Sequence, residues 1–280
     1  MNDFEGKVAV VTGAGSGMGR AFAQRSAEEG MKLVLGDIEQ TALDKAVEEL
    51  SAGGFDVVGV PTDVSKREAI QHLADVALER YGKLNVAFNN AGVEGFLDGA
   101  LWEATQKDWE WTMGVNLWSV IYGTQIFLPL ILAQDEEGYV VNTCSMTSVV
   151  RAGNMYGVAK QAIFAISETI YGQLQDYPKV GVTALCPGII ATRLFQGSRN
   201  RPTELQNEAR TAGQERGDDL RARMHERLSQ GMPPSEVANI LFGAIRENKL
   251  YVLTDHDWDD QVNQRHDDIM NGRNPEIPRN

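Results

Sequence analysis

The sequence predicts an α/β domain built on a doubly wound parallel sheet. Short, β-branched apolar runs alternate with helical segments along almost the whole chain, and glycines close several of those helices. A glycine-rich turn also joins the first apolar run to the first helix. Strict alternation of this kind is typical of parallel strands connected by crossover helices that cover both faces of one sheet.

Seven apolar runs are expected to form strands, and six longer segments are expected to form the helices between them. The strands are expected at residues 7–12, 31–36, 55–60, 84–88, 139–143, 180–185 and 250–253. The helices are expected at residues 18–29, 40–51, 66–81, 107–133, 154–175 and 233–246, the last opened by two prolines.

The whole chain, residues 1–280, is expected to form a single domain, since no linker, repeat or low-complexity tract divides it. Residues 193–232 are polar, charged and poor in apolar periodicity, with helical pieces expected at 204–215 and 218–228. We interpret this stretch as an insertion that serves the substrate side. An acidic tail follows the last strand, at residues 254–280.

Composition and charge argue against several classes of function. The chain carries 39 acidic and 26 basic side chains, so it has no basic stripe to neutralise nucleic-acid phosphates. The N-terminal residues lack the basic head and apolar body of a signal peptide, and the longest apolar run, near 126–132, is too short to cross a bilayer. Cys144 and Cys186 lie in apolar runs, and we interpret them as buried and reduced, without a disulfide or a bound metal. These features favour a soluble cytoplasmic protein.

The turn after the first strand has the spacing Gly13-x-x-x-Gly17-x-Gly19. Glycines there permit positive φ and let the backbone approach a pyrophosphate at the N-terminus of the following helix. An ordinary βα turn can be equally rich in glycine, so the spacing is a weak signal when taken alone. In this place it indicates a dinucleotide site, with contacts expected from Gly13, Ser16, Gly17, Met18 and Gly19.

Asp37 stands at the end of the second strand, 20 residues after Gly17. A carboxylate there can accept hydrogen bonds from both hydroxyls of an adenosine ribose, and it repels a 2′-phosphate. No arginine or lysine follows directly, because Ile38, Glu39 and Gln40 come next. Asp37 could instead cap the following helix. With the glycine turn in place we favour the ribose role, and therefore NAD(H) over NADP(H).

Tyr156 and Lys160 lie four residues apart in an expected helix, so their side chains share one face. A free phenol, with a pKa of about 10, is a poor acid or base at neutral pH, and a nearby ammonium lowers that pKa. Such a pair usually belongs to a packed or solvated helix face. A dinucleotide bound nearby would give the pair a reaction to catalyse.

Together these motifs resemble the short-chain dehydrogenase/reductase family, in its compact single-domain branch. The resemblance spans residues 7 to 253 in the family's order and at roughly its spacing, and the combination is far more specific than any single part. The matching elements are the glycine turn, Asp63, Asn89-Asn90-Ala91-Gly92, Asn116, Ser145, Tyr156-x-x-x-Lys160 and Pro187-Gly188-x-x-x-Thr192. The resemblance implies a Rossmann fold with a seven-stranded parallel sheet, three helices on each face, and a homotetramer or homodimer.

The resemblance also implies cofactor contacts beyond the glycine turn. Asp63 and Val64 would meet the adenine ring. Ile190 would meet the nicotinamide carboxamide through its backbone, and Thr192 would do so through its hydroxyl. The remaining cofactor contacts are expected from Asn90, Ala91, Gly92, Pro187 and Gly188, and from Tyr156 and Lys160.

The implied chemistry moves a hydride between the nicotinamide and a carbinol carbon, while a proton moves at the attached oxygen. Tyr156 would donate or accept that proton, and Lys160 would lower its pKa and hold the nicotinamide ribose. Ser145 would hydrogen-bond the reacting oxygen as charge develops on it. Asn116 stands where the family holds a water that extends a proton relay from the lysine.

Ser145 is the least regular member of this set. The family commonly has serine where Cys144 stands, and Ser145 lies 11 residues before Tyr156, where many members have about two more. A serine at a strand end can also simply satisfy nearby backbone groups. Ser148 is a remote alternative, and we choose Ser145.

The residues that face the substrate are expected at 94–97 and 149–155, at Ile189 and in the insertion at 193–232, with Met146 also in the lining. Most of the candidate side chains are apolar, which indicates a largely apolar lining, although several could belong to the core or to an interface instead. The candidates are Glu94, Phe96, Met146, Val150, Met155, Leu194 and Phe195.

The sequence therefore predicts NAD(H)-dependent interconversion of a secondary alcohol and a ketone. The substrate is expected to be of medium size and largely apolar: aromatic, alicyclic or steroid-like. The alternative is a catalytically silent, dinucleotide-sensing regulator, but such proteins typically lose the tyrosine or the lysine. The extended branch of epimerases and dehydratases expects another glycine spacing and a larger C-terminal domain. Neither a nucleic acid nor a membrane is expected as a partner.

Overall fold

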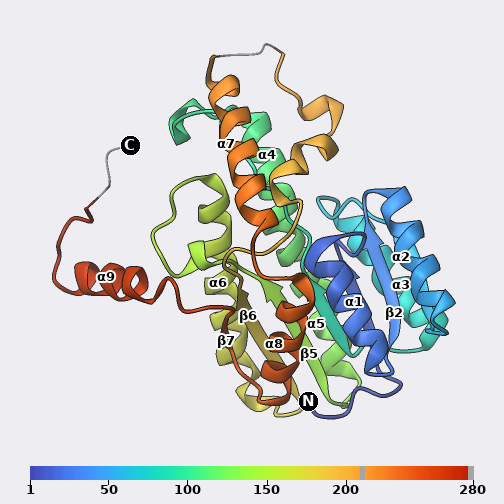
Figure 1. Cartoon of the computed structure of the whole chain (residues 1–280). Helices are drawn as coiled ribbons and strands as arrows, with labels where there is room; N and C mark the ends of the chain where they lie inside the picture. The colour runs from blue at the N-terminus through green and yellow to red at the C-terminus, as the bar shows by residue number, and fades with distance from the viewer. Residues whose placement is uncertain (209–211, 277–280) are drawn as a thin grey trace.

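The sheet has the strand order β3-β2-β1-β4-β5-β6-β7, and all neighbouring strands are parallel. The strands are β1 (Val8–Thr12), β2 (Lys32–Asp37), β3 (Val57–Pro61), β4 (Val86–Asn89), β5 (Gly138–Thr143), β6 (Val180–Cys186) and β7 (Tyr251–Leu253). The computed structural model describes residues 1–208 and 212–276, and it confirms the predicted seven-stranded, doubly wound Rossmann fold (Figure 1). The chain reverses its direction across the sheet between β1 and β4, which is where ligands bind in open α/β sheets.

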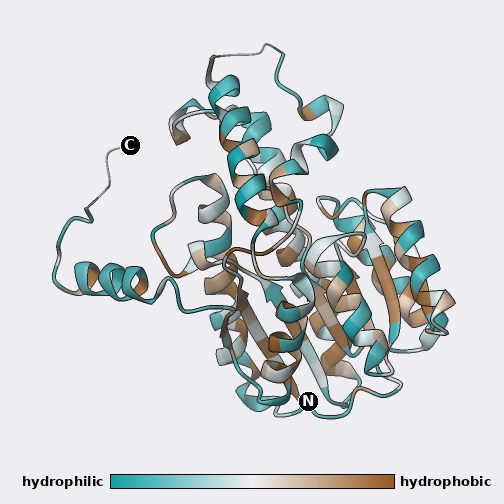
Figure 2. Cartoon of the chain, in the orientation of Figure 1, coloured by the Kyte–Doolittle hydropathy of each residue, from teal (hydrophilic) through white to brown (hydrophobic). Residues whose placement is uncertain are grey.

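Helices cover both faces of the sheet. One face carries α1 (Gly17–Glu28), α2 (Gln40–Ala52) and α8 (Pro234–Arg246), and the other carries α3 (Arg67–Tyr81), α5 (Ser119–Ala133) and α6 (Met155–Gln173). Aromatic rings bridge the first layer, where Phe22 and Phe242 both stack on Phe88 of β4. The strands between the layers are buried, and Figure 2 shows hydrophobic colour on them and on the inner helix faces. Burial on both faces explains why these strands have continuous apolar sequences.

The helix expected at 107–133 has the predicted extent but is interrupted. It consists of α4 (Gln106–Met113), a π-helical turn (Gly114–Trp118) and α5. A π turn adds one residue to a helical turn and is frequent at functional sites. Together these parts span 28 residues, and their most apolar segment has a mean hydropathy of 1.5. By length and composition alone such a helix could cross a membrane, although 39% of that segment is buried inside the protein. In this fold the helix instead packs against α3, β4 and β5.

The insertion is organised differently from the prediction. Two 3-10 turns, Leu194–Asn200 and Thr203–Leu205, are followed by α7 (Ala212–Ser229). The sequence predicts two helical pieces, at 204–215 and 218–228, whereas one helix, α7, continues through Gly217 between them. A Cβ at Gly217 would lie 1.9 Å from Oδ1 of Asp98, so the glycine permits a close contact and does not end the helix. Residues 209–211, within the first expected piece, lie outside the described residues.

The acidic tail contains a helix that the sequence analysis did not predict, α9 (Asp259–Met270), which projects away from the sheet (Figure 1). Asp259 and Asp260 lie in its first turn, where negative charge stabilises a helix N-terminus. Trp258 and Val262 pack against the buried cluster that contains Cys144. The start of α9 therefore attaches the tail to the domain through apolar contacts. Residues 277–280, at its end, lie outside the described residues.

Candidate functional site

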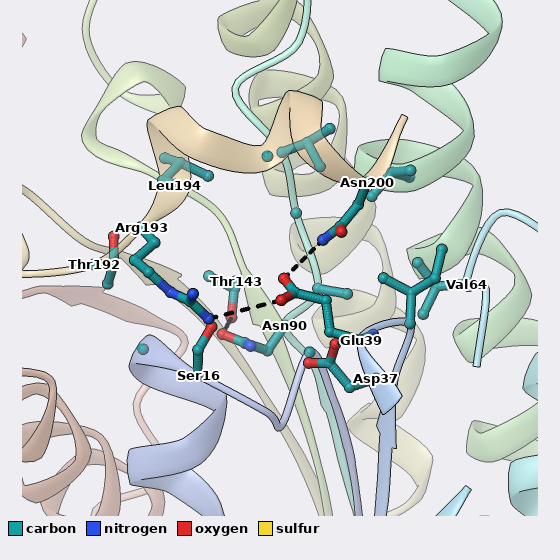
Figure 3. Close-up of a pocket in the computed structure, with 18 of the residues that line it drawn as sticks. Ser16, Asp37, Glu39, Val64, Asn90, Thr143, Thr192, Arg193, Leu194 and Asn200 are labelled. Carbon is teal, nitrogen blue, oxygen red and sulfur yellow. Dashed lines mark hydrogen bonds and ion pairs between the residues drawn. The ribbon is translucent and has the colours of Figure 1, made fainter. Parts of the chain in front are cut away.

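A cleft opens at the carboxyl ends of β1 to β5, at the point where the chain reverses its direction across the sheet. The glycine turn, Asp37, Asp63 and the Asn90-Ala91-Gly92 loop line one side, and Tyr156 and Lys160 lie in the same cleft. Residues from Thr192 to Asn200 close it from the insertion side (Figure 3). The fold thus brings most of the predicted cofactor residues and the Tyr156–Lys160 pair into one cavity, whereas Gly19, Pro187, Gly188 and Ile190 lie outside its lining.

The glycine turn has a shape that other residues could not take. Gly13 and Gly17 have φ values of 67° and 55°, and a Cβ at Gly19 would lie 2.0 Å from the Gly13 carbonyl oxygen. The Ser16 side chain makes no capping hydrogen bond to α1, and no acidic residue lies in the first turn of that helix. The N-terminus of α1 therefore presents backbone N–H groups to an anion in the cleft. Met18 lines the cleft beside them.

Asp37 lies at the end of β2, where its carboxylate faces the cleft. Oδ2 accepts a hydrogen bond from the Gly15 N–H at 2.8 Å, and Oδ1 accepts one from the Glu39 N–H at 2.9 Å. These bonds hold the carboxylate between the glycine turn and the loop before α2. Asp37 does not cap α2, because the N-cap residue of that helix is Glu39, whose side chain makes no capping hydrogen bond. The geometry therefore agrees with the ribose role and not with the capping alternative.

Asn90 ties three strand ends together under the cleft. Its Nδ2 donates to the Thr12 carbonyl oxygen at 3.0 Å, and its Oδ1 accepts from the Thr143 hydroxyl at 3.3 Å. The Thr12 hydroxyl in turn accepts from the N–H groups of Asn90 and Ala91. On the adenine side, the Asp63 carboxylate accepts both the N–H and the hydroxyl of Ser65, and Val64 is buried beside it. These bonds make the cleft floor a preformed surface.

Tyr156 projects from the first turn of α6, where Asn154 caps the helix by accepting the Gly157 N–H at 3.0 Å. Burial raises the pKa of Tyr156 to about 12, against the effect of a hydrogen bond with Ser145. The sequence analysis expected Lys160 to lower this pKa. The structure differs because removing the phenolate from water outweighs the favourable contacts. At neutral pH the phenol is therefore protonated.

Lys160 is buried one turn along α6, with its Nζ 5.5 Å from the centre of the Tyr156 ring. The ammonium donates to the Thr143 carbonyl oxygen at 2.6 Å. Burial lowers the pKa of Lys160 to about 8, so the group loses its proton close to physiological pH. The side chain thus connects the end of β5 to the phenol and lines the cleft at the same time.

The two candidate serines have different environments. The Ser145 hydroxyl accepts the Thr147 N–H at 3.2 Å and hydrogen-bonds Tyr156, although Ser145 does not line the cleft. The Ser148 hydroxyl is buried, donates to the Lys160 carbonyl oxygen at 2.8 Å and accepts the Ser145 N–H at 3.3 Å. Ser145 therefore meets the phenol, while Ser148 supports the backbone around it.

Asn116 occupies the π turn and is completely buried. Its Oδ1 accepts the Val93 N–H at 2.8 Å and its Nδ2 donates to the Val93 carbonyl oxygen at 3.0 Å, so the side chain positions the loop after β4. A Cβ at Gly92 would lie 3.1 Å from Asn116 Oδ1 and 3.6 Å from Lys160 Nζ. Because Gly92 has no side chain, the space between Asn116 and Lys160 stays open.

The Pro187-Gly188-x-x-x-Thr192 segment forms the wall opposite the glycine turn. The Gly188 N–H donates to the Thr254 hydroxyl at 2.9 Å, and Ile190 is buried and bridges to Met232. Pro187 accepts the Met146 N–H through its carbonyl oxygen at 3.0 Å. Among the predicted cofactor residues of this segment, Thr192 lines the cleft itself. Its Cγ2 would lie 3.1 Å from a Cβ at Gly17, so the two walls nearly touch there.

The predicted substrate residues are less well placed. Leu194 lines the cleft, whereas Phe96 lines a second cavity beside α4 and Phe195 lies in the insertion outside the lining. Met146, Val150 and Met155 are buried in the core, which the sequence analysis kept open as their alternative. Met146 packs in the same buried cluster as Cys144 and Ile163.

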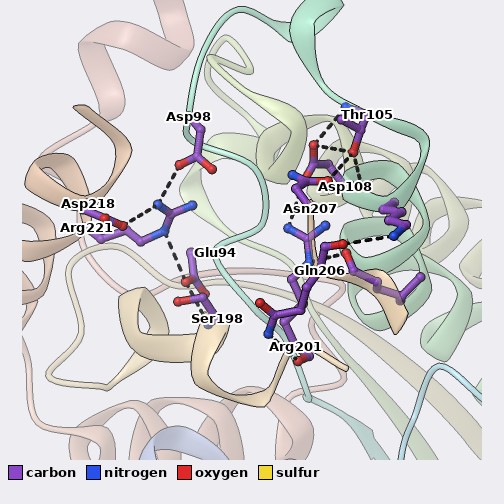
Figure 4. Close-up of polar contacts among 12 residues, drawn as sticks. Glu94, Asp98, Thr105, Asp108, Ser198, Arg201, Gln206, Asn207, Asp218 and Arg221 are labelled. Atoms are coloured by element: carbon purple, nitrogen blue, oxygen red, sulfur yellow. Dashed lines mark hydrogen bonds and ion pairs between the residues drawn. The ribbon is translucent and has the colours of Figure 1, made fainter. Parts of the chain in front are cut away.

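Glu94 was expected to face the substrate, but it is buried beneath the insertion. It is 1% exposed, accepts the Ser198 N–H at 3.0 Å and lies 3.6 Å from Nε of Arg221 on α7 (Figure 4). Arg221 also pairs with Asp98 at 2.7 Å. Burial raises the pKa of Glu94, so its charge depends on these partners. Glu94 therefore anchors the insertion and does not face a substrate.

A second anchor lies nearby, where Arg201 pairs with Asp108 of α4 at 2.8 Å and covers the Trp111 ring (Figure 4). Glu39 makes a third connection, because its carboxylate accepts a hydrogen bond from Arg199 and another from Asn200. Figure 3 shows the bond from Asn200. Partial burial opposes ionisation of Glu39, but these bonds outweigh it and lower its pKa. The sequence analysis missed these pairs because no local spacing links residues 39 and 199.

Within residues 1–208 and 212–276, no group of three or more His, Cys, Asp or Glu residues is arranged to hold a metal ion. Cys144 and Cys186 are both buried and free.

The chain is similar to known proteins over its whole length. A structure of a short chain dehydrogenase/reductase from Burkholderia phymatum in complex with NAD is 41% identical, covers 100% of both chains and superposes with a TM-score of 0.94. A 1-deoxy-11-beta-hydroxypentalenate dehydrogenase of Streptomyces avermitilis is 31% identical over 93% of this chain and 89% of its own. A CLA biosynthesis dehydrogenase/reductase of Lactiplantibacillus plantarum is 29% identical over 99% of this chain and 98% of its own.

A model of the short chain dehydrogenase family matches residues 7–203, the segment that carries the glycine turn, the Tyr156–Lys160 pair and the sheet up to β6. Taken with the geometry of the cleft, this match shows that the chain belongs to the short-chain dehydrogenase/reductase family of oxidoreductases.

Proposed function

We propose that this protein catalyses the NAD(H)-dependent interconversion of a secondary alcohol and a ketone. The observation that carries the proposal is that Tyr156 and Lys160 line the same cavity as the glycine turn and Asp37. A proton donor is thus adjacent to a dinucleotide cradle, which is what hydride transfer to a carbonyl carbon requires.

The cradle fits a dinucleotide on its own geometry. The positive φ of Gly13 and Gly17 and the open N-terminus of α1 suit a pyrophosphate, and the fixed Asp37 carboxylate suits a ribose diol. A 2′-phosphate would meet the negative charge of Asp37. This is our reason for proposing NAD(H) over NADP(H).

Bound NAD(H) would supply or accept the hydride. The residues of the chain handle the proton, and for ketone reduction the protonated Tyr156 donates to the developing alkoxide. Ser145 hydrogen-bonds that phenol, and this contact supports a role for its hydroxyl in stabilising the same oxygen. The Lys160 ammonium stabilises the phenolate that remains, and Asn116 and Gly92 leave room for a water that returns the proton.

We propose a medium-sized, largely apolar substrate, either aromatic, alicyclic or steroid-like. Leu194 at the cleft supports an apolar contact. The 31% identical relative is named for a hydroxypentalenate, which has a hydroxyl group to oxidise.

We also propose a cytoplasmic homotetramer or homodimer that binds neither nucleic acid nor a membrane. Association of copies is supported by exposed apolar surface on the α4–α5 helix, where Trp118, the last residue of the π turn, is 47% exposed. An uncovered apolar face of this kind suits a second copy of the chain. Light scattering on the purified protein would detect a particle of about twice or four times 30.8 kDa, and a monomer would contradict the proposal.

A panel of secondary alcohols and ketones, assayed with NAD(H) and NADP(H) in parallel, tests the function. We expect turnover of apolar cyclic substrates with a clear preference for NAD(H). Asp37→Ala should reduce that preference, since it removes the charge that repels the 2′-phosphate. Tight NADH binding without turnover of any substrate would favour the sensing regulator, and a preference of the wild type for NADP(H) would contradict the role of Asp37.

A further inference from the structure

Arg193 lies in the cleft, although neither the motifs nor the family resemblance assigns it a role. The backbone before it is well fixed, because Ala191 donates its N–H to the Met232 carbonyl oxygen at 2.9 Å. The Thr192 side chain nearly touches Gly17. The backbone of Arg193 therefore lies next to the glycine turn, across the cleft opening.

The side chain of Arg193 points back across that turn. Figure 3 shows its guanidinium group between Ser16 and Glu39, and the residue lines the cleft. Its one ion pair, with Oε2 of Glu39, is 4.0 Å long, and the side chain is 45% exposed. Within residues 1–208 and 212–276 this guanidinium makes no closer polar contact. Its N–H donors are thus available to a ligand.

The neighbouring cation, Arg199, differs in this respect. It is hydrogen-bonded to Glu39 before α2 and donates to the Gln196 carbonyl oxygen at 2.5 Å, so two of its nitrogens already have protein partners. Glu39 is satisfied by Arg199 and Asn200 without Arg193. Movement of Arg193 away from Glu39 would therefore leave no carboxylate without a partner.

We infer that Arg193 binds the pyrophosphate of the dinucleotide, exchanging its loose contact with Glu39 for the phosphate oxygens. This inference rests on the proposed use of NAD(H). The glycine turn and the N-terminus of α1 would hold the pyrophosphate from one side, and the planar guanidinium fork would close on it from the other. The cation matters because the cleft also contains Asp37, Glu39 and Asp63, and the chain carries a net charge of −13. A doubly charged pyrophosphate enters this negative field more readily beside a free arginine.

Binding of cofactor fragments tests the inference without turnover. ADP-ribose contains the pyrophosphate and adenosine lacks it, and the affinity of each can be measured by displacement of fluorescent NADH. For Arg193→Gln we expect an affinity for ADP-ribose about 10-fold lower or worse, while adenosine binds as it does to the wild type. Arg193→Lys should be intermediate, because it keeps the charge but loses the fork.

Arg223→Gln is the matched control. Arg223 is exposed on α7 outside the cleft, so this variant loses the same charge and should bind both fragments normally. The inference is overturned if Arg193→Gln binds ADP-ribose within about two-fold of the wild type, or if its adenosine affinity falls by the same factor. A wild type that binds neither NADH nor ADP-ribose would overturn the proposed function as well, so the two failures are distinguishable.

Discussion

The two walls of the cleft are held in place by different forces. The wall formed by the glycine turn, Asn90 and α6 rests on buried strands and on hydrogen bonds to backbone groups, such as that from Asn90 to Thr12 at 3.0 Å. The insertion wall is held by ionic side chains that reach across the fold, with Asp108 paired to Arg201 and Glu94 to Arg221.

The ionic contacts that hold the insertion wall leave some buried polar atoms of the described residues without a hydrogen-bond partner. Oε2 of Glu94 and Nη2 of Arg201 are buried without a hydrogen-bond partner among the described residues. Asn89 Oδ1 and Thr147 Oγ1 beside the first wall also lack a partner within this part of the chain, but Asn116 and Lys160 have their partners. Unpaired buried polar groups cost stability. We propose that the reacting groups belong to the first, rigid wall, and that the insertion adjusts recognition without disturbing them.

The largest effect is expected at the centre of the rigid wall. Tyr156→Phe removes the proton donor and should lower turnover by about 10³-fold or more, because general acid catalysis contributes about 10²–10⁴-fold. NADH affinity, measured by fluorescence titration, should stay close to that of the wild type. Tyr177→Phe, at an exposed tyrosine, is the control and should leave both quantities unchanged. Loss of NADH binding in Tyr156→Phe would show that the tyrosine is mainly structural.

Lys160→Met should also reduce turnover strongly, and it changes how stability depends on pH. Burial lowers the pKa of Lys160 to about 8, so between pH 8 and the ordinary value of 10.5 the unfolded state binds a proton that the folded state does not. This group therefore makes the wild type more stable as the pH rises through that window, by on the order of 3 kcal/mol.

Urea unfolding of the cofactor-free protein at pH 7.5 to 10.5, the range spanned by the pKa of about 8, measures that dependence. Lys160→Met should lose it, and Lys179→Met, at an exposed lysine, should keep it. The same pKa predicts that ketone reduction declines as the pH rises above about 8, where the ammonium loses its proton while Tyr156, with a pKa of about 12, stays protonated. A reduction rate that rises through this window would contradict both assignments.

Substitutions of Ser145 and Ser148 should have different effects, one on catalysis and the other on stability. Ser145→Ala should lower kcat by about 10²-fold, since it removes a donor to the reacting oxygen. Ser148→Ala should mainly lower the free energy of unfolding, by about 1–3 kcal/mol, because its hydroxyl holds the Lys160 carbonyl oxygen and the Ser145 N–H. Steady-state kinetics and urea unfolding measure the two effects. Near-normal turnover in Ser145→Ala would remove this serine from the mechanism.

The smallest effect on chemistry is expected in the insertion. Arg221→Met breaks the contacts of α7 with Glu94 and Asp98 and should raise the substrate KM several-fold, with kcat within about two-fold of the wild type. Lys179→Ala breaks an exposed pair with Asp135 and serves as the control, with no measurable change. A large fall in kcat with an unchanged KM would mean that the insertion takes part in catalysis, and the distinction between the two walls would fail.

The sequence analysis was most successful where local rules determine structure. The glycine turn, the strand ends at Asp37 and Asn90, and the Tyr156–Lys160 spacing each follow from short-range geometry, and the fold brings them together in one cleft. The insertion was predicted less well, because two helical pieces were expected where α7 continues through Gly217. A glycine can end a helix or allow a close contact, and only the position of Asp98 distinguishes the two.

The sequence by itself determined the doubly wound sheet, the place of the cleft and part of its lining, from the glycine turn and Asp37 to the Tyr156–Lys160 pair, since alternation and motif spacing are properties of neighbouring residues. Only the tertiary structure decided the electrostatics of the site. Burial raises the pKa of Tyr156 to about 12 and lowers that of Lys160 to about 8, and the long-range pairing of Glu39 with Arg199 leaves Arg193 available in the cleft. These properties depend on which distant residues exclude water and which charges become neighbours, and sequence spacing does not specify either.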